Sequence, residues 1–148
     1  MSLQQRIDAD LKSAMLAKDE VRVSTLRMLK SALGYLRIER KTEMLSDGDI
    51  VGVIQKELKK RREAIEQYKT GNRPDLVERE QKEAAVLESF LPQALTDTEL
   101  EKLVQATIQE LGATGKKDMG AVIRAVQAKA AGRADGKAIS AAVGKLLP

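Results

Sequence analysis

The residues of this chain that could do chemistry are mainly lysines and arginines near its carboxyl end. Lys117 and Arg124 stand seven positions apart, which places them on the same face of a helix. Gly120 and Ala128 belong to that face, and such small side chains let another molecule's backbone come close while the two cations contact phosphates. A solvated helix face is the alternative interpretation of each single residue. For residues 116–136 as a whole, we expect recognition of a polyanion.

Seven basic residues in this part of the chain are candidates for binding nucleic acid. They are Lys116, Lys117, Arg124, Lys129, Arg133, Lys137 and Lys145. Residues 115–148 contain these seven basic residues and two acidic ones, a net charge of +5, whereas residues 96–114 contain one lysine and four acids, a net charge of −3. The positive charge is therefore concentrated in the last two predicted helices, where it would attract phosphates.

A second basic patch precedes them in the chain. It consists of Lys59, Lys60, Arg61 and Arg62. Consecutive charges wrap around a helix, so these four side chains cannot all touch one ligand. The helix predicted to follow carries four glutamates: Glu78, Glu80, Glu83 and Glu88. We expect these acids to pair with the basic run and shield it, which makes this patch the lesser candidate.

The residue inventory excludes several kinds of catalysis. The chain contains no histidine and no cysteine, so it offers no imidazole base, no histidine-ligated metal site and no thiol nucleophile. A catalytic pair of carboxylates is not excluded, although Asp118 and Asp135 are better interpreted as residues that start helices. We therefore assign no catalytic residue, metal or cofactor, and do not expect the chain to be an enzyme by itself.

Composition and spacing predict an all-α protein. Aromatic residues make up only 2% of the chain and hydrophobic residues 43%, which is enough to bury a core. Helix-start signals recur: Ser2 has Gln5 three residues later, and Ser46 and Thr96 each precede an acid at the third helical position. We predict about seven helices, four before Pro92 and three after it, and no strand.

The segment around Pro92 divides the chain into two predicted subdomains. Proline ends the preceding helix, and a new capped helix begins a few residues later. We expect an N-terminal helical subdomain over residues 1–92 and a C-terminal three-helix bundle over residues 93–148. Part of the bundle's core should be a stripe of apolar residues at helical spacing: Met119, Val122, Ile123, Val126 and Ala130.

Charge and composition also bear on where the protein works. A net charge of +4 and a pI of about 9.3 are compatible with nucleic-acid binding. No stretch approaches the ~20 apolar residues of a membrane span, and the charged N-terminus does not resemble a signal peptide. The absence of cysteine fits a reducing compartment. We expect a cytoplasmic protein without membrane association, and the sequence does not indicate its oligomeric state.

Several short motifs resemble those of a known family. They are residues 25–30 (TLRMLK), 55–62 (QKELKKRR), 87–92 (LESFLP), 117–120 (KDMG) and 132–137 (GRADGK). On these residues the chain resembles, nearly end to end, the YqeY-like proteins of the GatB/YqeY group. Its second part is similar to the C-terminal tail of the B subunit of the tRNA-dependent amidotransferase, although proline often stands there where Gly136 stands here. Either residue suits the start of a helix.

The resemblance implies two helical subdomains and a link to tRNA, because that amidotransferase converts Glu-tRNA(Gln) or Asp-tRNA(Asn) to the amide form and its tail contacts the tRNA. We expect a tRNA-binding accessory protein linked to tRNA-dependent amidation. The alternative is a helical interaction module that docks on an aminoacyl-tRNA synthetase or amidotransferase without touching RNA. A third hypothesis is that the chain is part of a carbon–nitrogen ligase with glutamine as amide donor. It is the least favoured, because this chain lacks the kinase-like and amidase parts of that enzyme.

Overall fold

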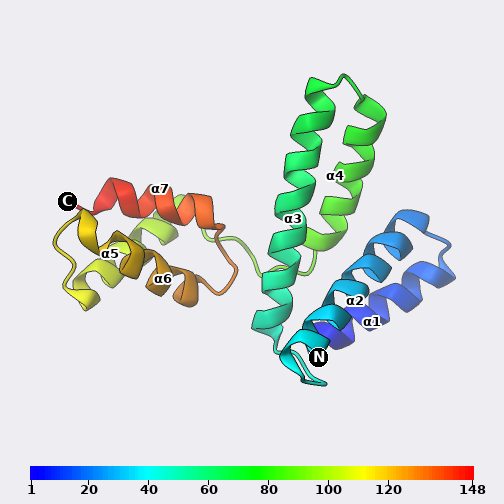
Figure 1. Ribbon diagram of the computed structural model, residues 1–148, viewed down its shortest axis with the longest axis horizontal. Helices are drawn as coiled ribbons and strands as arrows, with labels where there is room; N and C mark the ends of the chain where they lie inside the picture. Colours follow the sequence, from blue (N-terminus) through cyan, green and yellow to red (C-terminus); the bar gives the residue numbers. More distant parts are fainter. The chain divides into compact units, whose positions relative to one another are not determined.

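The computed structural model describes residues 1–148 and confirms the all-α prediction, with seven α-helices and no strand (Figure 1). The helices are α1 (Leu3–Leu16), α2 (Glu20–Arg40), α3 (Asp47–Thr70), α4 (Pro74–Glu88), α5 (Asp97–Leu111), α6 (Met119–Ala130) and α7 (Gly136–Leu146), with a 3₁₀ turn, η1 (Lys116–Asp118), before α6. Contacts divide the chain into two compact units, Met1–Leu91 and Pro92–Pro148, which we call unit 1 and unit 2.

The helices begin where the sequence predicted caps. Ser2 and Gln5 form a capping box at α1, and Ser46 and Asp49 form another at α3. Thr96 accepts a hydrogen bond from the backbone nitrogen of Glu99 at the start of α5. Each of these hydroxyl oxygens satisfies a backbone N–H that has no partner within its own helix, so local sequence determines these boundaries.

The helix ends follow the sequence less closely. Gly112 ends α5 in the left-handed region with a φ of 65°, as a closing glycine should. At α6 the left-handed residue is Ala131, with a φ of 48°, and Gly132 follows at 85°. At α3 the C-cap residue Gly71 has a φ of −79°, and Asn72 adopts the left-handed conformation instead. Asparagine tolerates that conformation because its side chain can bond locally.

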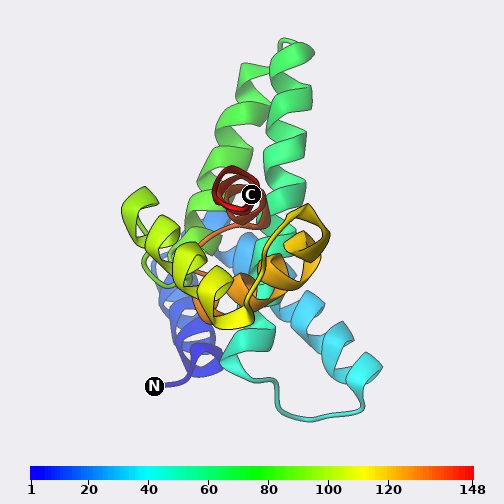
Figure 2. The same ribbon diagram turned by 90° about the vertical axis from the view of Figure 1, so that its left-hand side faces the viewer.

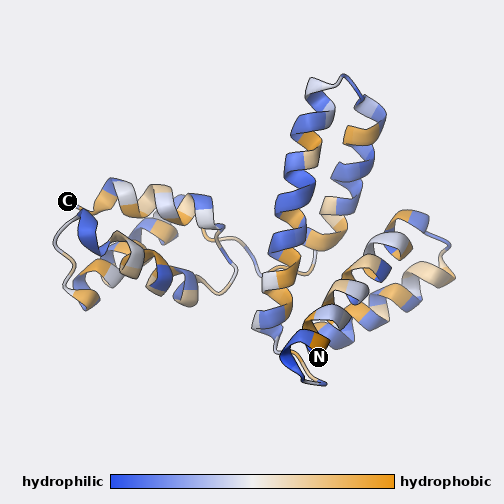
Figure 3. Cartoon of the chain, in the orientation of Figure 1, coloured by the Kyte–Doolittle hydropathy of each residue, from blue (hydrophilic) through white to orange (hydrophobic).

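Unit 1 is built from two helix pairs, α1 with α2 and α3 with α4, and α2 also packs on α3 and α4. Its core contains mainly leucine and isoleucine, including Leu3, Ile7, Leu26, Leu29, Leu33, Ile50, Ile54, Leu58, Leu87 and Phe90. Figure 3 shows hydrophilic residues over most of α3 and α4 toward the turn that joins them. The apolar packing is therefore concentrated at the other end of these two helices.

Unit 2 is a three-helix bundle in which α5, α6 and α7 each pack on the other two; Figure 2 looks nearly along α7. Its core consists of small and branched side chains: Leu100, Val104, Val122, Val126, Ala130, Ile139, Val143 and Leu147. Met119 and Ile123 are half-buried against this core, so the apolar stripe predicted for α6 is confirmed. None of the seven helices has both the length and the apolar content needed to cross a membrane.

The first residues of unit 2 are attached to the turn between α6 and α7. The backbone nitrogen of Leu95 donates to the carbonyl oxygen of Arg133 over 2.8 Å. In return, Arg133 Nε donates to the carbonyl oxygen of Gln93 over 2.8 Å. One Arg133 guanidinium nitrogen also lies 3.7 Å from a carboxylate oxygen of Glu99. These contacts hold the segment before α5 against the bundle.

Candidate nucleic-acid interface

The outer side of α6 is lined by small residues around one arginine. Five exposed positions lie on this side, opposite the buried valines: Gly120, Ala121, Arg124, Gln127 and Ala128. Lys129 of α6 is also exposed, but it is paired with Glu110. The first of the five, Gly120, has no side chain, and Arg124 lies along the helix above it: a Cβ atom built on Gly120 would be 3.5 Å from Arg124 Nη1. The guanidinium therefore lies close to the helix, beside a surface with few projecting atoms.

This surface continues onto α7. A Cβ atom built on Gly136 would lie 3.6 Å from Gln127 Nε2, so the end of the α6 stripe adjoins the first turn of α7. At the other end, a Cβ on Gly144 would lie 3.6 Å from Met119 Cε, so the two helices run antiparallel. Lys137 is exposed immediately after Gly136. We use the term α6–α7 face for Lys117, Gly120, Ala121, Arg124, Gln127, Ala128 and Lys137.

Three of the seven predicted basic residues, Lys117, Arg124 and Lys137, belong to this face. All three are exposed, and none forms an ion pair or a side-chain hydrogen bond within the chain. Lys117 lies in η1, seven positions before Arg124 and just ahead of the first turn of α6. The face thus presents three cations that have no partner within the chain, on a surface where glycine and alanine leave few projecting side-chain atoms.

The other four predicted residues have partners within unit 2. Lys116 Nζ donates to the carbonyl oxygen of Gly144 over 2.5 Å, close to the end of α7. Lys145 Nζ lies 3.1 Å from a carboxylate oxygen of Glu101. In the same way, Lys129 pairs with Glu110, and Arg133 holds the segment that precedes α5. These cations are less available to a ligand than the three on the α6–α7 face.

The structure separates the members of the second basic patch. Arg61 is buried, with an exposed fraction of 6%, so its inclusion in a surface patch is wrong. It pairs with Glu80 over 3.1 Å and with Glu83, both on α4. Lys60 lies 3.6 Å from Glu57, and Arg62 lies 3.7 Å from Glu88. Only Lys59 is exposed without an ion pair. The expected pairing of α3 with the acidic α4 is confirmed.

The two aspartates that were candidates for carboxylate chemistry serve the backbone. Asp135 accepts a hydrogen bond from the backbone nitrogen of Ala138 over 2.7 Å and caps α7. Asp118 accepts from the backbone nitrogen of Thr114 over 3.0 Å, so it stabilises the turn before η1 and does not cap α6. The structure contains no group of three or more acidic side chains that could hold a metal ion.

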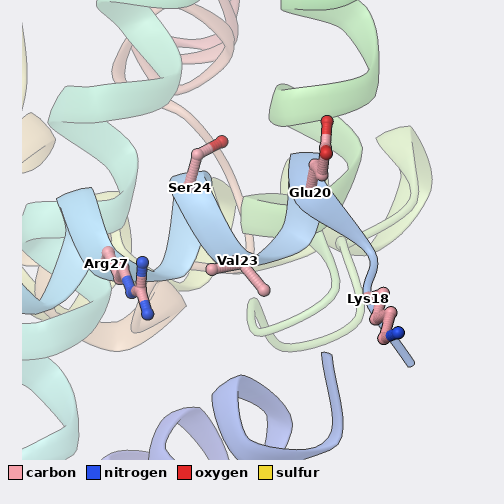
Figure 4. Close-up of a pocket in the computed structure, with 5 residues that line it drawn as sticks. All are labelled: Lys18, Glu20, Val23, Ser24 and Arg27. Atoms are coloured by element: carbon pink, nitrogen blue, oxygen red, sulfur yellow. The ribbon is translucent and has the colours of Figure 1, made fainter. Parts of the chain in front are cut away.

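Two surface hollows lie in unit 1. The larger, about 670 Å³, is lined by Lys18, Glu20, Val23, Ser24 and Arg27 (Figure 4). The smaller, about 270 Å³, lies at the turn between α3 and α4 and includes Arg73. There a hydrogen bond with Asp75 raises the pKa of Arg73 and lowers the pKa of Asp75, so both groups stay charged. Both hollows are open to solvent and are not enclosed cavities.

Known proteins similar to this chain include fungal ones. A protein of Pyrenophora tritici-repentis named altered inheritance of mitochondria protein 41, mitochondrial, is 30% identical over 131 residues, which cover 87% of this chain and 71% of that protein. Its namesake in Vanderwaltozyma polyspora is 30% identical over 74% of this chain and 63% of its own length. In Lachancea thermotolerans the identity is 33%, over 69% of this chain and 56% of that protein. The chain thus spans between half and three quarters of these relatives.

The relatives contradict the cytoplasmic location expected from the sequence, because all three are named as mitochondrial proteins. The features behind that expectation do not identify one compartment. A lack of cysteine and of membrane-spanning helices is as compatible with the interior of a mitochondrion as with the cytoplasm.

The family assignment rests on nearly the whole chain. The sequence profile of the Yqey-like protein family matches residues 4–147, from the second residue of α1 to the position after the end of α7. Both units, and every helix that carries a candidate residue, lie within this match. The resemblance to YqeY-like proteins seen in the sequence motifs is therefore confirmed, and the chain belongs to the YqeY-like family.

Proposed function

We propose that this protein binds tRNA through the α6–α7 face and serves as an accessory protein in tRNA-dependent amidation. The observation that carries the proposal is the set of three exposed cations, Lys117, Arg124 and Lys137, that have no partner within the chain. Cations paired within a protein lose part of their interaction with phosphate, whereas unpaired ones keep it.

The shape of the face suits a nucleic-acid backbone. Glycine and alanine let a phosphate–ribose chain approach the helix, and Arg124 lies low enough to contact a phosphate from beside Gly120. Arg124 and Lys137 belong to α-helices, which position side chains more precisely than loops do. Contacts with phosphates fix the position of the RNA but do not read its base sequence. Such a face would therefore recognise the RNA by its shape.

The link to amidation rests on the resemblance of unit 2 to the amidotransferase tail. In that enzyme the tail contacts the tRNA and the catalytic machinery lies elsewhere. A stand-alone protein of this kind would hold or present the tRNA without performing the amidation chemistry. This role needs neither a metal nor a cofactor, and it agrees with a chain that has no histidine and no cysteine.

The test is titration of a labelled tRNA with the full chain at several salt concentrations. Each phosphate that the protein neutralises should add about 0.9 to the magnitude of the log–log slope, a value taken from B-DNA. The double variant Lys117→Ala with Arg124→Ala should bind more weakly and reduce that slope by about 2. Arg133→Ala is unsuitable, because Arg133 also holds the segment before α5.

A charge-matched control is Lys59→Ala with Lys102→Ala. Both lysines are exposed and have no ion pair, and they lie on α3 and α5. We expect this control to bind tRNA as the parent does. If both double variants lose affinity equally, the attraction is that of the whole protein's charge and the α6–α7 face is not the site. If the parent does not bind tRNA, the alternative of a module without RNA contact replaces this proposal.

A further inference from the structure

The second surface that lacks an internal partner is the outer side of α2 in unit 1. Large apolar side chains project from it into solvent: Tyr35 and Ile38 are each 76% exposed, and Met28 is 46% exposed. Ser24 lies one turn before Met28, and Ser31 lies between Met28 and Tyr35; both serines are also exposed. The opposite side of α2 carries the buried leucines of the core. This apolar stripe is therefore not needed for the fold, and exposure of such side chains marks binding surfaces.

A hollow extends the stripe toward the start of α2. Val23, Ser24 and Arg27 of α2 line it together with Lys18 and Glu20, and its volume is about 670 Å³ (Figure 4). It is an open depression that a side chain of another molecule could enter from solvent. From Val23 to Ile38 the helix rises about 22 Å, which corresponds to four turns of a partner helix. We use the term α2 face for Val23, Ser24, Arg27, Met28, Ser31, Tyr35, Ile38 and Lys41.

Positive charge lines the edge of this face nearer α1. Arg27 and Lys41 are exposed and have no ion pair. Lys30, on the same edge, lies 3.0 Å from Asp8 of α1 and remains 42% exposed. On the other edge, Met28 Sδ lies 3.8 Å from the buried Arg61 beside α4. Two exposed acids border the face as well: Glu20 lines the hollow, and Glu39 lies one turn after Tyr35, on the side of Met28. The α2 face thus combines an apolar stripe with a basic edge nearer α1.

We propose that the α2 face binds an amphipathic helix of a partner protein, with apolar side chains over Tyr35 and Ile38 and acidic residues opposite Arg27 and Lys41. Tyrosine and arginine are among the residue types that contribute most to protein interfaces, and an amphipathic helix binds through anchors one or two turns apart. A second copy is a poorer occupant, because its matching face carries the same cations. Apolar side chains such as Ile38 contribute little to phosphate binding, which disfavours RNA as the occupant.

The experiment places a photo-crosslinking amino acid at Tyr35 of the full chain, Tyr35→p-benzoylphenylalanine, in cells that normally produce the protein. We expect crosslinks to one protein segment whose apolar residues have the spacing of an amphipathic helix and which is rich in Asp and Glu. The same substitution at Glu63, on the solvent side of α3, is the control and should give no such product. Adding Arg27→Glu and Lys41→Glu should lower the Tyr35 crosslink about tenfold or more, because like charges then face each other.

Circular dichroism melts show whether each variant keeps the parent's fold. Crosslinking to a second copy, to RNA, or to no molecule above the Glu63 control would overturn the proposal. Persistence of the crosslink after charge reversal would also overturn it. The α2 face lies in unit 1, so loss of tRNA binding in the α6–α7 variants would leave this result unchanged.

Discussion

Basic residues close together in the sequence can have opposite roles, and Arg61 and Lys59 of α3 are the clearest case. Arg61 has an exposed fraction of 6% and pairs with Glu80 and Glu83, whereas Lys59 is exposed without an ion pair. We predict that Arg61→Met destabilises the protein by about 3 kcal/mol, because it leaves Glu83 buried with Arg79 as its only remaining cation. Urea unfolding followed by circular dichroism measures the change.

The matched control is Lys59→Ala, which should change the free energy of unfolding by less than about 0.5 kcal/mol. A double variant, Arg61→Met with Glu83→Leu, should recover much of the loss, since no unpaired charge then remains buried. A cost below about 1 kcal/mol for Arg61→Met alone would show that the pair contributes little.

At the scale of the element, the stability contributed by the helix cap at the start of α3 should depend on pH. Asp49 bonds back to Ser46 in the capping box and pairs with Arg40 of α2. The hydrogen bond from Arg40 is the largest cause that lowers the pKa of Asp49 below its ordinary value of 3.8, and the bonds with Ser46 lower it further. The folded protein therefore holds this carboxyl ionised to a lower pH than the unfolded chain does.

The sign of the pH dependence follows from this depressed pKa. The stabilisation should be fully present above the unfolded pKa of about 4, and it should be lost as the pH falls through the lower folded pKa. We predict that the free-energy difference between the parent and Asp49→Asn is largest above about pH 5 and narrows on acidification. Urea unfolding between about pH 2 and 6 measures it. In an Arg40→Gln background the narrowing should be smaller; an equal narrowing would rule out Arg40 as its cause.

At the scale of the whole molecule, we expect the two units to be separable. Each has its own core and its own capped helices. We predict that residues 92–148, expressed alone, give a helical circular dichroism spectrum and a cooperative thermal melt. The stability should be small, because a domain of this size buries little surface. A spectrum without helix, or a melt without a transition, would contradict independent folding of unit 2.

A shorter fragment is the control for where unit 2 begins. Residues 96–148 lack Gln93 and Leu95, and so lose both hydrogen bonds with Arg133. This fragment should melt at a lower temperature than residues 92–148, by several degrees if the two bonds contribute about 1 kcal/mol. Equal melting temperatures would show that the segment before α5 does not stabilise the bundle.

Local patterns in the sequence predicted the elements of this protein well. Hydrophobic spacing indicated the helices, and Ser2, Ser46 and Thr96 marked three of their starts. These features depend on contacts within one or two turns, and such contacts are encoded by residues close together in the chain. The motifs also pointed to the YqeY-like family, which the match over residues 4–147 confirms.

Only the tertiary structure decided which charges are free. Seven basic residues looked alike in the sequence, yet Lys129 and Lys145 pair with Glu110 and Glu101 of α5, and Arg133 bonds to Gln93, 40 positions earlier. In the same way, burial removed Arg61 from its patch. Sequence spacing determines the face of a helix on which a charge lies. The acid that reaches it is determined by the packing of helices distant in the sequence, because an ion pair needs two side chains within about 4 Å.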